Sequence, residues 1–165
     1  MWETLSAIAA IATTLIIGAT AIAAVHQIRQ LRLSTQLEGL LALHEEFHSE
    51  KIVAAREFVA KELPAKLRDK AYRDEIALGT ATISNHREFV LADYWEKIGL
   101  LVREGVLDAD LYLAIGAYRC IEAWEQLRPV IELQRVKEPL QWEPFDHMAR
   151  LSREYLEKKK PTGSA

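Results

Sequence analysis

The feature that most constrains this sequence is its uncharged run from Leu5 to Val25, LSAIAAIATTLIIGATAIAAV. At a rise of about 1.5 Å per residue, a helix of this length covers the roughly 30 Å hydrocarbon core of a bilayer. Its only polar side chains are one serine and three threonines, whose hydroxyls can bond back to the helix backbone. The run therefore predicts a transmembrane helix over residues 1–25.

A cleaved secretory signal is the alternative interpretation of the same run. Residues 21–23, Ala-Ile-Ala, have the small-residue pattern of a cleavage site. A signal peptide normally begins with positive charge, whereas this chain begins Met-Trp-Glu. The positive charges of Arg29 and Arg32 instead follow the run, which places the N-terminus outside and the C-terminal domain in the cytoplasm. A retained single-pass anchor is the favoured prediction.

Two rows of residues in the N-terminal part predict association between copies of the chain. Small side chains recur at every fourth position of the run, and such a ridge lets two helices approach closely. No proline occurs from His26 to His48, so the helix is expected to continue as a juxtamembrane stalk over residues 26–48. The predicted interface combines the ridge with one stalk face: Ser6, Ala10, Thr14, Gly18, Leu33, Leu37 and Leu40. A solitary anchor without a partner is the alternative.

Charge and cysteine content exclude several classes of function. The 165 residues contain 21 Lys and Arg against 24 Asp and Glu, so no basic surplus points to nucleic acid. The single cysteine, Cys120, excludes an internal disulfide and suits a reducing cytoplasm. No glycine-rich phosphate loop, nucleophile elbow or C-x-x-C motif is present, and no cofactor is expected.

Residues 49–158 predict a cytoplasmic bundle of about five amphipathic helices, which makes the fold all-α. Ser49 and Asp108 are suitable N-caps, and Gly105 is a natural helix terminator. Residues 159–165 are expected to be a disordered tail. The predicted core is aromatic and aliphatic: Phe58, Trp95, Leu101, Trp124, Leu127 and Leu151.

One motif points to metal chemistry. Residues 44–48, His-Glu-Glu-Phe-His, fit the H-E-x-x-H pattern of zinc peptidases, in which two histidines one helical turn apart bind zinc. His44 also lies in the apolar stripe of the stalk, and a core or interface histidine explains that position equally well. His44 and His48 are therefore the candidate metal ligands, with Glu50, His86 and His147 as possible third ligands, and no catalytic or cofactor-binding residue is assigned.

A second cluster combines charge with an aromatic ring on neighbouring turns of one predicted helix. It consists of Arg119, Trp124, Glu125 and Arg128. Such a group can recognise an anionic ligand or a partner helix. The simpler interpretation, which we prefer, is an arginine stacked on the tryptophan and paired with the glutamate, so that the cluster holds the bundle together.

Short motifs are spread along almost the entire chain. They are WETLS at 2–6, VHQIR at 25–29, QLE at 36–38, AREFV at 55–59, WEKIG at 95–99, RC at 119–120 and WEQLRP at 124–129. With them the chain resembles a bacterial family of small single-span membrane proteins of unknown function. The resemblance implies a place in the bacterial inner (plasma) membrane. That family has no established activity, so no functional residue is implied.

Together these observations predict a membrane-anchored helical scaffold or interaction protein without catalytic chemistry. Its expected partners are the lipid bilayer, copies of itself and an unidentified membrane or cytoplasmic protein. A pore-forming or transporter-like oligomer is one alternative, in which Thr13, Thr14 and Thr20 line a channel. A zinc peptidase that uses His44 and His48 is the other.

Overall fold

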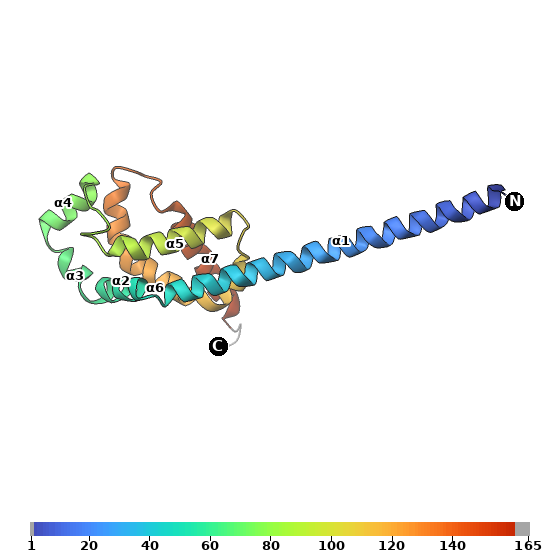
Figure 1. Cartoon of the computed structure of the whole chain (residues 1–165). Helices are drawn as coiled ribbons and strands as arrows, with labels where there is room; N and C mark the ends of the chain where they lie inside the picture. Colours follow the sequence, from blue (N-terminus) through green and yellow to red (C-terminus); the bar gives the residue numbers. More distant parts are fainter. Residues whose placement is uncertain (1, 161–165) are drawn as a thin grey trace. The chain divides into compact units, whose positions relative to one another are not determined.

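The computed structural model describes residues 2–160, with the backbone alone at residues 3–12, 14, 15 and 32. All regular elements in this range are helices, so the predicted all-α class is confirmed (Figure 1). By packing, the chain divides into two compact units, Met1–Gly39 and Leu40–Ala165. The helices are α1 (Trp2–Phe47), α2 (Glu50–Lys61), α3 (Leu63–Lys66), α4 (Lys70–Leu78), α5 (Glu88–Arg103), α6 (Ala109–Arg135) and α7 (Glu143–Lys159).

The predicted transmembrane helix over residues 1–25 is wrong. Among the residues that the structure describes, no helix is both long enough and apolar enough to cross a bilayer. Alanine, threonine and glycine make up more than half of the run from Leu5 to Val25, and these small side chains offer less apolar area than leucine or phenylalanine. The predicted location, a single-pass inner-membrane protein with its N-terminus outside and its C-terminal domain in the cytoplasm, is contradicted by the same finding. The pore alternative required this span.

The expected continuity of the first helix is confirmed, because α1 runs without interruption through Gly39 to Phe47. Leu43 and Phe47 are buried in the second unit. Ser49 then caps α2, as predicted: its side chain accepts a hydrogen bond from the Ile52 backbone N–H at 3.4 Å. The end of the predicted tail, residues 161–165, lies outside the described residues.

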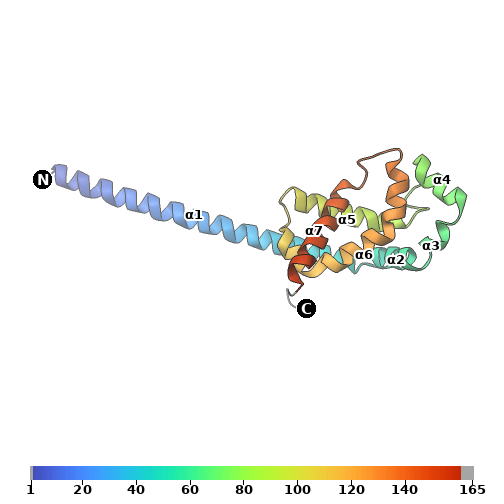
Figure 2. The same cartoon turned by 180° about the vertical axis from the view of Figure 1, so that it is seen from behind.

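The second unit is a bundle in which α7 packs most extensively on α5 and α6 (Figures 1 and 2). α2 packs on α5, and α4 packs on α6. The predicted core residues Phe58, Trp95, Trp124 and Leu127 are buried. The other two, Leu101 and Leu151, are partly buried and pack against this core. The apolar stripes read from the sequence therefore face inward.

The crossing of α5 and α7 is unusually close at Gly99. A Cβ atom added to Gly99 would lie 2.0 Å from the carbonyl oxygen of Pro144 and 2.4 Å from its carbonyl carbon. One turn earlier on α5, a carboxylate oxygen of Glu96 accepts the backbone N–H of Phe145 at 2.9 Å. α7 thus receives its N-terminal cap from another helix, since its own N-cap residue, Trp142, makes no side-chain cap.

Candidate functional site

The first candidate site is an exposed apolar surface on α1. Large aliphatic side chains along this helix are more than half exposed, and we call six of them the α1 apolar surface: Ile16, Ile17, Ile22, Val25, Ile28 and Leu31. The predicted interface residues Leu33 and Leu37 are also more than half exposed. An apolar surface of this extent is uncommon on a protein that acts alone.

The other predicted interface residues have different surroundings in the structure. The side chains of Ser6, Ala10 and Thr14 lie outside the described residues. Gly18 has open space where a side chain would extend, with no described atom within 4 Å. Leu40 belongs to the second unit, where it is partly buried and packs against the core. Its apolar area is therefore used partly within its own chain.

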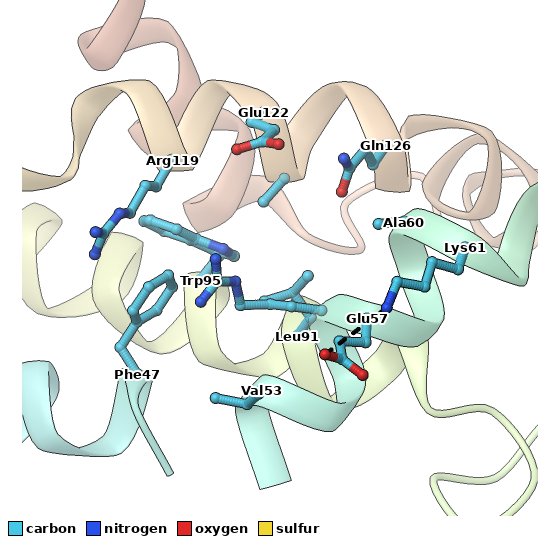
Figure 3. A pocket seen from close by; sticks show the side chains of 12 residues that line it. Phe47, Val53, Glu57, Ala60, Lys61, Leu91, Trp95, Arg119, Glu122 and Gln126 are labelled. Atoms are coloured by element: carbon cyan, nitrogen blue, oxygen red, sulfur yellow. Dashed lines mark ion pairs between the residues drawn. The ribbon is translucent and has the colours of Figure 1, made fainter. Parts of the chain in front are cut away.

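The second candidate site is a cleft of about 280 Å³ in the Leu40–Ala165 unit. We call it the arginine cleft. Phe47, α2, α5 and α6 line it, with Arg56 from α2, Trp95 from α5 and Arg119 from α6. Figure 3 shows Arg119, Phe47 and Trp95 together at one end of the cleft, and the ion pair of Lys61 with Glu57 at the other.

Two guanidinium groups lie against the ring of Phe47 in this cleft. The Cζ atom of Arg56 is 4.4 Å from the ring centroid, and that of Arg119 is 5.0 Å from it. Among the side chains that the structure describes, no carboxylate lies within ion-pair distance of either group. Cation–π contact with a phenyl ring holds each guanidinium in place but leaves its positive charge uncompensated.

Trp95, which lines the arginine cleft, carries an unsatisfied hydrogen-bond donor. Trp95 is 1% exposed, and its indole Nε1 is the one buried side-chain polar atom in the described residues that lacks a hydrogen-bond partner. A buried donor without a partner costs roughly 1–3 kcal/mol. The two arginines also act on the neighbouring Tyr94. Burial raises the pKa of its phenol, and the positive charges of Arg119 and Arg56 lower that pKa.

A buried polar network lies between α4 and the start of α5. His86 and Glu88 are both fully buried. The Nδ1 atom of His86 is 2.9 Å from an oxygen of Glu88, and its Nε2 atom is 3.0 Å from an oxygen of Glu75. The hydroxyl of Tyr72 donates to both carboxylate oxygens of Glu88, at 2.7 and 2.8 Å. Because both ring nitrogens face carboxylates, the geometry suits an imidazolium that donates on both sides.

The phenol of Tyr72 remains a donor in this network. Burial and the adjacent carboxylate of Glu88 raise the pKa of Tyr72 well above its usual range. Each member of the network therefore has a partner inside the chain. This arrangement is typical of a structural brace, and a satisfied network of this kind helps to specify one packing.

These geometries can be compared with known proteins. Residues 8–152 match the family described as a domain of unknown function, DUF4760. The chain belongs to the DUF4760 family. The match confirms the resemblance to a family of unknown function. Comparisons with curated proteins and with solved structures gave no match.

The predicted cluster of Arg119, Trp124, Glu125 and Arg128 does not form one site. Trp124 is buried against Phe145 with ring centroids 5.0 Å apart, and Arg135 rather than Arg119 lies over its ring. Glu125 pairs with Arg128 at 3.6 Å and with Arg153 at 2.9 Å. Only Arg119 lines the arginine cleft. It shares that cleft with Trp95 and Arg56, which are distant from it in sequence.

The candidate metal ligands His44 and His48 stand one turn apart, with ring centroids 4.4 Å from each other. The Nδ1 atom of His48 lies 2.8 Å from the carbonyl oxygen of His44, so this nitrogen already has a backbone partner. Within the described part of the chain, no group of three or more His, Cys, Asp or Glu side chains is placed to hold a metal ion. His86, a candidate third ligand, lies in the buried network instead.

Cys120 is expected to be unreactive in the folded protein. It is fully buried, and burial raises the pKa of its thiol to about 12. Because the thiolate is the nucleophile, modification by a disulfide reagent at pH 8 should be negligible until the chain is unfolded in denaturant. Counting reactive thiols with and without denaturant checks this: about one per chain should appear only on unfolding. A rapidly reacting native thiol would contradict the burial of this residue.

Proposed function

We propose that this protein is a helical interaction protein that assembles with copies of itself through α1. The observation that supports the proposal is the exposure of the α1 apolar surface in the single chain. Burying one large aliphatic side chain contributes roughly 1.5–3 kcal/mol. Covering several of them on each copy is therefore a sufficient driving force for association.

The distribution of these side chains favours several neighbours over one. At about 100° per residue, the six side chains of the α1 apolar surface spread over roughly 240° of the helix circumference, from Ile16 to Ile22, which is wider than one stripe. A helix that is apolar around its circumference needs cover on more than one side. A bundle of α1 helices from several copies provides it.

Copies of the same chain suit this role for an electrostatic reason as well. The sequence between Glu3 and His26 contains no charged residue, so α1 helices can pack over this length without repulsion between like charges. The proposal therefore commits to a homo-oligomer whose interface includes the α1 apolar surface. A scaffold of this kind requires no catalytic residue.

The substitution Ile28→Glu is expected to abolish or strongly weaken the assembly. It places a charge in the α1 apolar surface at a side chain that is 53% exposed, where it makes no core contact within its own unit. Mutual burial of unpaired carboxylates from several copies would be strongly unfavourable. Multi-angle light scattering after size-exclusion chromatography measures the change as a fall in assembly mass.

The matched control is Gln30→Glu, which adds the same charge two positions further along the same helix, at a polar and exposed residue outside the arc of the six apolar side chains. It should leave the assembly mass almost unchanged. An Ile28→Glu chain that keeps the wild-type mass would remove this surface from the interface. Circular dichroism of both variants reports whether the helical content is preserved.

A further inference from the structure

We propose that the arginine cleft binds a small amphiphilic anion, an oxyanion headgroup attached to a short apolar body. The headgroup would be a carboxylate or a phosphate, held between Arg56 and Arg119 and accepting a hydrogen bond from the indole N–H of Trp95. This inference concerns the second unit alone and does not depend on assembly through α1.

Arg56 and Arg119 carry positive charge that no described carboxylate compensates. Four other guanidinium groups of this unit, those of Arg103, Arg128, Arg135 and Arg153, pair with carboxylates. Arg56 and Arg119 instead converge on one phenyl ring from two different helices. Both guanidinium groups thus lie within 5.0 Å of the same ring centroid, and the forked donors of a guanidinium match the geometry of an oxyanion.

The buried indole of Trp95 also indicates an anionic ligand. The Trp95 ring lines the same cleft as both arginines, and its N–H finds no acceptor in the described part of the chain. Buried donors are almost always satisfied, so an orphan beside a cleft indicates an acceptor supplied from outside the chain. An oxyanion between the arginines provides acceptor oxygens, whereas a cationic or purely apolar ligand does not.

Apolar side chains line the cleft next to these donors. Leu91 and Ala123 are buried beneath the cleft, and Val53 is an exposed aliphatic side chain at its edge. A volume of about 280 Å³ lies near the lower end for small-molecule pockets. An anion with a short apolar body would use both the charge and this lining, whereas a free inorganic anion would use only the charge.

The acidic groups of the cleft set the position of the ligand. Glu57 pairs with Lys61 at 3.9 Å, and both belong to the end opposite Arg119 (Figure 3). Glu122 also lines the cleft and is exposed to solvent, where water screens its repulsion of an anion. The headgroup is therefore expected at the end formed by Phe47, Trp95 and Arg119, with the apolar body extending toward Leu91.

The test is a titration of the full-length protein with hexanoate and, separately, with hexyl phosphate. Two-dimensional NMR of the tryptophan indole N–H groups follows binding, because the sequence has four tryptophans and the variant Trp95→Phe identifies the signal of Trp95. We expect a saturable shift of this one signal with at least one of the two probes. The double variant Arg56→Gln/Arg119→Gln should weaken binding by about tenfold or more.

The matched control is Arg128→Gln, which removes the same charge from α6 at a residue that pairs with Glu125 and does not line the cleft. Its affinity should equal that of the wild type. No shift of the Trp95 signal with either probe would overturn the proposal, as would equal affinity of the double variant. Inorganic phosphate that binds as tightly as hexyl phosphate would overturn the apolar part of the assignment, and hexanol that binds as tightly as hexanoate would overturn the anionic part.

Discussion

Replacing Gly99 by alanine is expected to destabilise the helical bundle by about 3 kcal/mol or more. The new Cβ would lie 2.0 Å from the carbonyl oxygen of Pro144, and this contact is with backbone, which cannot rotate away like a side chain. Either α7 must move away from α5 or its first turn must distort. Overpacking of a core typically costs roughly 1–3 kcal/mol, and a clash with backbone belongs at or beyond the upper end of that range.

The consequence extends to the cap that Glu96 provides. Moving α7 away from α5 would lengthen the 2.9 Å hydrogen bond between Glu96 and the Phe145 N–H. Urea denaturation followed by circular dichroism measures the combined loss. The control is Gly39→Ala, where the added Cβ meets no atom within 4 Å and alanine favours the helix by roughly 0.5–1 kcal/mol. If Gly99→Ala proves as stable as Gly39→Ala, the close crossing of α5 and α7 is refuted.

The substitution Glu88→Gln is expected to cost about 3–5 kcal/mol of the free energy of unfolding. It removes one charge from a carboxylate that is fully buried between His86 and Tyr72. The Nδ1 atom of His86 and the hydroxyl of Tyr72 both contact oxygen Oε1 of Glu88, and the same hydroxyl also contacts Oε2. In the glutamine variant one of these oxygens becomes an NH2 group, which donates instead of accepting, and the other loses its share of the negative charge. The buried Nδ1 atom of His86 would then face a neutral group instead of a carboxylate.

The matched control uses the other carboxylate on the same imidazole. Glu75 lies 3.0 Å from the Nε2 atom of His86, but its side chain is 51% exposed. Because water can solvate this side of the imidazole when the charge of Glu75 is removed, Glu75→Gln should lower the free energy of unfolding by less than about 1 kcal/mol. Chemical denaturation of the two variants under the same conditions gives the comparison. Equal losses would show that burial does not set the strength of this network.

Local signals in the sequence predicted much of the fold. Asp108 caps α6 as expected, with its side chain accepting the backbone N–H of Leu111 at 2.9 Å. Gly105 follows α5 with a left-handed φ of 68°, the conformation that suits glycine after a helix. These features depend on a few neighbouring residues. The run from Leu5 to Val25 shows the opposite case: its lack of charge suggested a membrane span that the described helices do not contain.

The features that sequence reasoning missed all depend on contacts between distant segments. Nothing near Gly99 indicates that the carbonyl of Pro144 would approach it, and nothing near His86 indicates two carboxylate partners and a phenol. Arg119 was found as a candidate ligand residue, but its neighbours were chosen by closeness in sequence. The helix turns Trp124 into the core, while Arg119 lies in a cleft with residues of α2 and α5. These residues become neighbours of Arg119 only when α2, α5 and α6 pack together.

The most direct test of the proposed assembly is the mass of the unmodified full-length protein by sedimentation equilibrium over a wide range of concentration. One chain has a mass of 18.7 kDa. Assembly through α1 predicts a single species at a whole-number multiple of that mass, which shifts to smaller species in the Ile28→Glu variant. A chain that sediments at 18.7 kDa at every concentration would contradict the account, because the α1 apolar surface would then be left uncovered by any copy.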